Sequence, residues 1–405
     1  MLLADDNPSK LSRDEGVLAV LLIVGLYFPT SIGGEYLPIF YQVSLLGALS
    51  VLLYLISKRG ARPGAGTYLV LPVLLLLTAS TFSTLLTHSF PIGWGTLLEY
   101  ILLVLVLSLD LRGVVPGPFM RRAFVIANVV GIGCGILILI GNETFDTFLS
   151  TFYAYFYAEL VPNMLRLHKP VLTFGTHSLA GFFLYLFFWL NWENYNARRT
   201  KLALCGALSW LILLLAVASV TALALASLAF AQIGVWLWKR NRKAFAAAAL
   251  VLFVGLLAGG KWLEDYFEIT EPMELVSGFF GNEVSGPVAR YGPGGSERGR
   301  IEYLVNRPFA PIGVAAPVFA ATVDSAPIDY LLRGSVPLLV LLYFGVFRFA
   351  RHNLTSRTHA LTLFFVIVGF EVGFTVLSYF RTFYLLPLVV VYLNNLSPVD
   401  DRPAV

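Results

Sequence analysis

The stretch Leu202–Trp238, LALCGALSWLILLLAVASVTALALASLAFAQIGVWLW, decides the fold class of this chain. It contains no charged residue. A helix that crosses a bilayer needs roughly 20 apolar residues, so this stretch is too long for one crossing. We expect two helices, 201–218 and 220–238, separated at Ala218-Ser-Val-Thr221, where small polar residues can complete a tight turn.

The composition of the whole chain indicates that apolar helices are not confined to this stretch. Apolar residues make up 58% of its 405 residues and charged residues only 13%, and the mean hydropathy is +0.77. Soluble domains contain about 25% charged residues. The composition therefore predicts an all-α, polytopic integral membrane bundle of about 11 to 12 transmembrane helices. The net charge of +4 is too small to indicate nucleic-acid binding.

We divide the chain into three parts: 1–260 with nine helices and an outer segment at 142–170, a large outer loop at 261–330 with one short amphipathic helix, and 331–405 with the C-terminal helices and a short cytoplasmic tail. The first apolar stretch has no small-residue cleavage site, and we interpret it as a retained first helix. The expected spans are 16–34, 37–57, 67–88, 94–109, 121–141, 171–191, 201–218, 220–238, 243–260, 331–349, 358–379 and 382–396.

The distribution of Lys and Arg predicts a cytoplasmic N-terminus, because basic residues favour cytoplasmic loops. With this orientation every inner connection carries a basic residue, and 19 of the 28 basic residues lie inside. The nine on the outer side are Arg166, Lys169, Lys261, Arg290, Arg298, Arg300, Arg307, Arg333 and Arg381. Two explanations remain open for them: solvation of long loops with local ion pairs, or binding of an anionic ligand at the outer surface.

Cys134 and Cys205 each lie in an apolar run without a Cys or His neighbour, so we expect neither a disulfide framework nor a metal site. In the outer segment 142–170, the aromatic run at 152–157 is typical of an interfacial helix. In the outer loop, 297–306 has a helical apolar face and is followed by Pro308, which we expect to end the helix.

Two segments carry recognisable motifs. Gly299–Gly313, GRIEYLVNRPFAPIG, leads to Val323–Ser335, VDSAPIDYLLRGS, and this pair resembles the signature of the O-antigen ligase and polymerase superfamily. Lys169–Gly181, KPVLTFGTHSLAG, resembles the motif at the start of a middle span in that family, with Lys169 where arginine is commoner. The family's Ser-Arg-Gly turn is here Ser219-Val-Thr221, without arginine.

The resemblance implies a membrane glycosyltransferase of the GT-C-like class. Asp324-Ser325 in place of His-Asn favours a polymerase over a ligase. It would join polyprenyl-diphosphate-linked repeat units, by an inverting transfer without metal or cofactor, at the outer face of a bacterial cytoplasmic membrane. The implied partners are the lipid bilayer and a lipid-linked glycan donor and acceptor, and a chain-length regulator protein is a further candidate partner.

The chemistry of the residues is consistent with that reaction. Arginine binds phosphate oxygens with a planar fork and stays charged, and a donor aimed at the leaving diphosphate is typically worth roughly 3–4 kcal/mol. Arg300 matches the arginine of the family motif and opens the predicted loop helix, so the resemblance implies that it is the diphosphate ligand; an ion pair with Glu297 or Glu302 is the alternative. Asp324 is the candidate base, with a helix cap as the alternative, and Asp329 near the same membrane boundary is a second candidate for either role.

Other candidates also have structural alternatives. His177 is a candidate catalytic residue or a hydrogen-bonded structural one, one turn into its span. The candidate substrate-binding residues are Arg166, Lys169, Arg290, Arg298, Arg307, Arg333, Arg381 and Tyr330. For the candidates near the ends of spans, anchoring of the side chain at the membrane interface is the alternative to substrate binding. Glu371, deep in a span, must be paired or protonated, since an ionised group there costs about 2.5–3.5 kcal/mol.

Two further functions remain open. A ligase would transfer the finished glycan to another acceptor with the same geometry. A transporter or flippase of a lipid-linked sugar would more typically show two repeated halves with broken helices at the midplane, and the sequence shows no such repeat.

Overall fold

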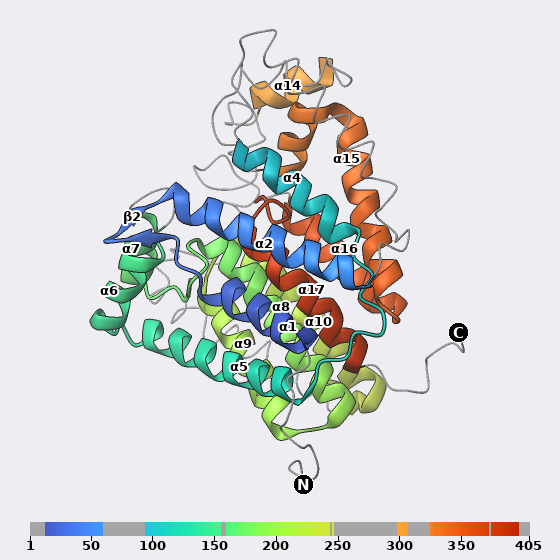
Figure 1. Cartoon of the computed structure of the whole chain (residues 1–405). Coiled ribbons are helices and arrows are strands. Elements are labelled where there is room, and N and C mark those ends of the chain that lie inside the picture. The colour runs from blue at the N-terminus through green and yellow to red at the C-terminus, as the bar shows by residue number, and fades with distance from the viewer. Residues whose placement is uncertain are drawn as a thin grey trace.

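The computed structural model describes residues 13–59, 94–154, 159–243, 245–246, 298–306, 325–371 and 374–396, and these are almost entirely helical (Figure 1). The all-α prediction is confirmed for this part of the chain. The helices are α1 (Arg13–Tyr27), α2 (Pro38–Arg59), α4 (Trp94–Leu107), α5 (Pro118–Leu139), α6 (Glu143–Phe152), α7 (Leu160–Arg166), α8 (His177–Arg198), α9 (Lys201–Ala216), α10 (Val220–Arg240), α14 (Arg298–Asn306), α15 (Ala326–Asn353), α16 (Arg357–Glu371) and α17 (Phe380–Leu396).

Four helical segments are long and apolar enough to cross a membrane: Pro38–Ser57, Pro118–Leu139, Thr221–Arg240 and Gly334–Asn353. Shorter apolar helices accompany them, at Glu15–Tyr27, Leu98–Leu107, Lys201–Ala216 and Phe380–Leu396. Large apolar side chains are exposed on the outside of the bundle, among them Ile126, Val129, Ile212 and Phe365. Extensive exposed apolar surface is uncommon on soluble monomers, so the surface is consistent with a lipid environment.

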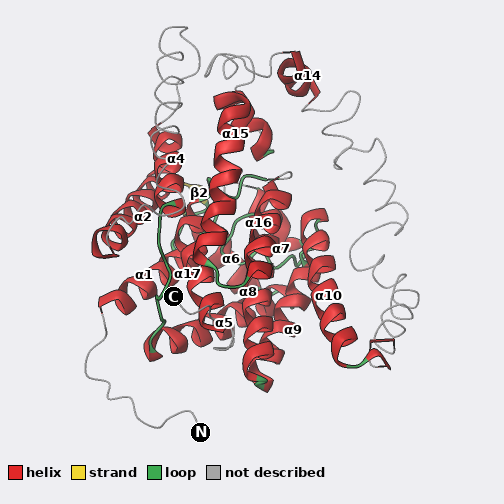
Figure 2. Cartoon of the chain, turned by 90° about the vertical axis from the view of Figure 1, so that its right-hand side faces the viewer, coloured by secondary structure: helices red, strands yellow, loops and turns green. Residues whose placement is uncertain are grey.

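Helices α8 and α17 form the centre of the bundle. Every residue from Leu179 to Trp192 of α8 and from Phe380 to Leu393 of α17 is buried. The two helices contact each other, and α1, α2, α9 and α10 pack around them (Figure 2). Because α8 and α17 are apolar on all faces, only the interior of a large assembly of helices can accommodate them.

One end of the bundle, which we call the hairpin end, gathers the β-hairpin with the ends of α1 and α6 and the beginnings of α8 and α17. Strands β1 (Ser31–Ile32) and β2 (Glu35–Tyr36) pair antiparallel, and the Thr30 amide donates to the Phe152 carbonyl at 2.9 Å. The turn between the strands places Gly33 and Gly34 at φ +64° and +84°, values that glycine adopts without steric cost.

At the hairpin end, side chains cap the last carbonyl groups of α1, which have no partner within the helix. Arg381 donates to the carbonyls of Gly25 and Phe28 at 3.0 and 3.1 Å. Thr173 Oγ1 donates to Leu26 O, and Tyr153 Oη donates to Tyr27 O at 2.8 Å. Four successive carbonyls are thus satisfied away from water, as an apolar environment requires.

The opposite end, which we call the asparagine end, is held by amide side chains. Asn353 at the end of α15 accepts from Leu111 N at 2.7 Å and donates to Leu109 O at 2.9 Å. Asn394 and Asn395 at the end of α17 donate to Asn353 O and to Val114 O. The connection after α4, the end of α15 and the end of α17 therefore meet at the asparagine end.

The structure corrects several predicted helix bounds. The first span was predicted to reach 34, but α1 ends at Tyr27, because Pro29 has no N–H to donate and the hairpin follows. The predicted 171–191 begins only at His177, after Leu172 and Gly175 with φ of 50° and 82°. His177 is consequently the first residue of its helix and not one turn inside it.

Other predictions on element positions agree with the structure. The break in the opening stretch lies between Ala216 and Val220, with Ser219 as the cap of α10. The predicted loop helix 297–306 is α14, Arg298–Asn306. The outer segment 142–170 differs from the prediction. An interfacial helix was expected over the aromatic run 152–157, but α6 ends at Phe152, Tyr153 and Ala154 are not helical, and the second short helix, α7, begins at Leu160. The predicted spans 67–88 and 243–260 and most of the 261–330 loop lie outside the described residues.

Candidate functional site

The segment between α7 and α8 lies at the hairpin end and carries three of the predicted site residues. Arg166 ends α7, Lys169 lies in the connection, and His177 begins α8. The connection is irregular: His168 and Leu172 have φ of 52° and 50°. Thr176 then caps α8, its Oγ1 accepting from Leu179 N at 3.1 Å, which is the standard way to begin a helix.

The two cations of this segment have no carboxylate partner within the described residues. Arg166 is exposed and Lys169 is half-buried. Burial lowers the pKa of the Lys169 ammonium from its ordinary value, since desolvation disfavours the charged form. A cation that is partly desolvated without a counter-charge gains from a bound anion, so this segment can accommodate a phosphate group.

Asp146 is an acidic group beside this segment that the sequence did not single out. Burial raises the pKa of its carboxyl from the ordinary value, and His168 opposes that shift. Its Oδ1 is buried and has no hydrogen-bond partner among the described residues. The only sequence signal was its place one turn after the Asn142 cap of α6, which is too common to identify a functional carboxylate.

Helix α14 carries Arg298 and Arg300 above the start of α15. Leu304 packs with Ile328 and Leu332 of α15 in a small apolar cluster. Arg300, one turn before Leu304 on the same face, is only 7% exposed. Arg298 is exposed and forms an ion pair with Glu302 at 2.7 Å. Glu302, which the sequence offered as an alternative partner of Arg300, therefore pairs with Arg298.

Tyr330 and Glu371 form a buried pair between α15 and α16. The Tyr330 hydroxyl donates to Glu371 Oε1 at 3.0 Å, and the Leu377 amide donates to the same oxygen at 2.9 Å. Glu371 is 0% exposed, and its Oε2 has no hydrogen-bond partner among the described residues. The partner that the sequence left unnamed is thus Tyr330, which lies too deep to contact a ligand in this conformation.

Arg381 is likewise fully buried. Besides α1, its guanidinium donates to Thr173 O at 2.6 Å and to Tyr379 Oη at 3.0 Å. The rings of Phe380 and Phe174 lie 4.9 and 5.6 Å from its Cζ, a distance at which aromatic faces stabilise cations. Every nitrogen of Arg381 donates to a protein oxygen, so in this structure it supports the segment before α8 and does not face a ligand.

A chain of hydrogen bonds connects the two motif segments. Tyr330 binds Glu371, Glu371 accepts from Leu377, and the same turn continues to Tyr379, whose hydroxyl donates to Phe174 O at 3.1 Å. The beginning of α15 and the beginning of α8 therefore lie on either side of the turn 374–379. Residues 169–181 and 325–335 are brought to the same end of the bundle.

Several predicted site residues have no described side chain. Asp324, Arg290 and Arg307 lie outside the described residues. For Arg333 only the backbone is described, within α15 and directly before the kink at Gly334 and Ser335. Within the described ranges, no three His, Cys, Asp or Glu side chains lie together as metal ligands.

Comparison with known proteins gave no match: no family model fits the chain, and neither a curated protein nor a solved structure shows significant similarity.

Proposed function

We propose that this protein is a membrane glycosyltransferase that polymerises polyprenyl-diphosphate-linked oligosaccharide units, with its site at the hairpin end of the bundle facing the exterior. One observation supports this proposal above the others. The two segments that resemble the O-antigen polymerase family, far apart in sequence, are connected through the turn 374–379 at one end of the helices.

In the proposed reaction an acceptor hydroxyl oxygen forms a bond to the anomeric carbon of the donor sugar. The bond from that carbon to the diphosphate breaks, and the diphosphate leaves with the electron pair. Arg300 stabilises the leaving diphosphate, Asp324 takes the acceptor proton, and Arg166 and Lys169 hold phosphate groups of the lipid carriers. The base accelerates the reaction by removing the acceptor proton, and the diphosphate ligand does so by stabilising the negative charge of the leaving group.

The position of the cations agrees with this chemistry. Arg166 and Lys169 have no carboxylate partner among the described residues, and Lys169 is half-buried in the connection before α8. Polyprenyl chains would pack against the exposed apolar surface of the bundle, with their phosphate groups near these cations. Within the same class, a ligase that uses another acceptor would employ the same residues.

The test uses the full chain in a mild detergent with a polyprenyl-diphosphate repeat unit, no nucleotide sugar and excess chelator. We expect a ladder of longer lipid-linked glycans. Arg300→Ala and Asp324→Asn should each lower the rate by about 10²–10³-fold. Arg122→Ala, an exposed cation at the asparagine end, is the matched control and should retain the ladder.

A transporter of lipid-linked glycan is the second candidate, favoured by the buried carboxylate of Glu371. Buried acids within membrane helices are typical of ion-coupled transport. Movement of the lipid across liposomes that requires the protein and is lost in Glu371→Gln, without a ladder in detergent, would reject the glycosyltransferase in favour of transport.

A further inference from the structure

A cavity at the asparagine end carries a second cluster of cations that the proposed reaction does not use. It measures about 80 Å³ and lies between α5, α8 and α17. Its polar lining consists of Arg121, Asn194, Arg198, Asn395 and Tyr392, and the Tyr392 hydroxyl donates to Met120 O. A cavity of this size holds several water molecules or one phosphate group.

The charge balance of this cavity favours an anion. Arg121 donates through Nε to Pro116 O at 3.2 Å, and neither Arg121 nor Arg198 pairs with a described carboxylate. No acidic residue lines the cavity. Glu15 is the nearby acid, and its Oε1 accepts from Met120 N at 3.1 Å at the beginning of α5.

Asn194 supplies a further observation that points to a ligand. Its Oδ1 is buried and has no hydrogen-bond partner among the described residues. Asn194 and Arg198 are one turn apart on α8 and therefore face the same side. A buried amide oxygen without a donor is costly, so a ligand that brings both an anion and a hydroxyl group would satisfy the whole cavity.

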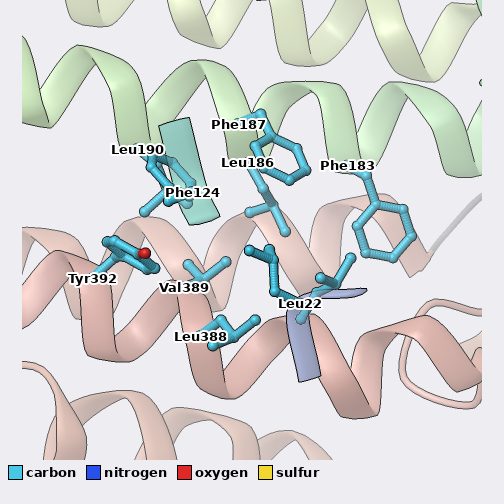
Figure 3. Close-up of a pocket in the computed structure, with 10 residues that line it drawn as sticks. Leu22, Phe124, Phe183, Leu186, Phe187, Leu190, Leu388, Val389 and Tyr392 are labelled. Carbon is cyan, nitrogen blue, oxygen red and sulfur yellow. The ribbon is translucent and has the colours of Figure 1, made fainter. Parts of the chain in front are cut away.

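A smaller, apolar cavity adjoins this one and shares part of its lining; Figure 3 shows the residues of the apolar cavity. Phe124, Leu190 and Tyr392 line both, and in the figure these three lie toward one end, with Phe183 and Leu22 toward the other. On the outer side, Val125 lines the polar cavity and is exposed, and it continues the apolar face of α5. The arrangement is that of an amphiphile site, with cations at the mouth and hydrocarbon behind them.

We propose that this cavity binds the headgroup of an acidic phospholipid from the adjacent leaflet. The phosphodiester lies between Arg121 and Arg198, a headgroup hydroxyl donates to Asn194 Oδ1, and the first methylene groups pack on Phe124 and Val125. Arginine forks match phosphate oxygens, and basic pockets between membrane helices commonly bind anionic headgroups. The proposal does not depend on the glycosyltransferase reaction.

The test measures lipid retention by native mass spectrometry on the full chain in neutral detergent, with phosphatidylglycerol or phosphatidylcholine in mixed micelles. We expect selective retention of phosphatidylglycerol. Arg121→Gln and Arg198→Gln should each weaken it about tenfold, as for one lost charge-assisted contact. Asn194→Asp, nearly identical in shape, should weaken it at least as much through like charge.

Arg122→Gln is the matched control, because Arg122 adjoins Arg121 in sequence and does not line the cavity. Its retention of phosphatidylglycerol should equal that of the unaltered protein. Equal retention of both lipids, or an equal loss in Arg122→Gln and Arg121→Gln, would overturn the proposal. Complete displacement of the lipid by millimolar inorganic phosphate or glycerol phosphate would also overturn it and indicate a soluble anion as the ligand.

Discussion

Replacing Arg381 by methionine should destabilise the protein more than any exposed basic substitution. The guanidinium is 0% exposed and connects α17 to the last turn of α1 and to the segment before α8. Its positive charge also lies at the C-terminal end of α1, where the helix dipole favours a cation. Methionine retains much of the apolar stem but none of the donors.

The structure sets the magnitude of the effect. Loss of the guanidinium leaves the carbonyls of Gly25, Phe28 and Thr173 without this donor. Each buried acceptor left unpaired costs about 1–3 kcal/mol, but the cost of burying the arginine itself is recovered. We therefore expect a loss of about 3–5 kcal/mol, typical of breaking a buried charged network. The stability of Arg381→Lys should lie between those of the unaltered protein and Arg381→Met, because one ammonium group cannot reach all three carbonyls.

The assay is unfolding in detergent by added denaturant, followed through the buried tryptophans Trp189 and Trp210. Arg122→Met is the control: Arg122 is exposed at the asparagine end and takes no part in the proposed reaction, so it should change stability by less than about 0.5 kcal/mol. Equal stability of Arg381→Met and Arg122→Met, with glycan binding lost only in Arg381→Met, would refute the structural role and restore Arg381 as a ligand.

Three further results are expected from the same assay. Arg112 holds the pKa of Asp110 at about 2, below its usual 3.8. The resulting stabilisation of the folded state is complete above about pH 4 and is lost as the pH falls through about 2. Asp110→Asn should therefore lower the free energy of unfolding by about 1 kcal/mol at pH 7, a small value because Arg112 is half-exposed, and by almost nothing at pH 2. An equal loss at the two pH values would contradict this assignment. Asn128→Ala removes the acceptor of the Trp210 indole N–H at 2.6 Å and should cost about 1–2 kcal/mol with a shifted tryptophan emission; unchanged emission would argue against it. Ser219→Ala removes the cap of α10 and should cost about 0.5–2 kcal/mol, whereas no measurable loss would show that the cap is dispensable.

Part of the candidate site could be predicted from the sequence. The motif at Lys169–Gly181 predicted a functional segment before a helix, and the structure places Lys169 in the connection before α8 and His177 at the first position of α8, with Arg166 just ahead at the end of α7. Asp146 and the partner of Glu371 could not be predicted. Their contacts join residues far apart in the chain, and no local pattern encodes which distant side chain will face a buried carboxylate.

The amino-acid sequence alone determined that the chain is helical and apolar and that a helix breaks at Ser219, because hydropathy and turn-forming residues are local properties. The end of α1 at Tyr27 was not predicted, since the first span was expected to continue to 34. Only the tertiary structure decided that Arg381 caps α1, that Tyr330 pairs with Glu371, and that Arg121 and Arg198 share a cavity. A charged residue near the end of a span gives the same sequence pattern whether its side chain lies at the membrane interface, binds a ligand or caps a helix. Helix packing decides which of these partners the side chain meets.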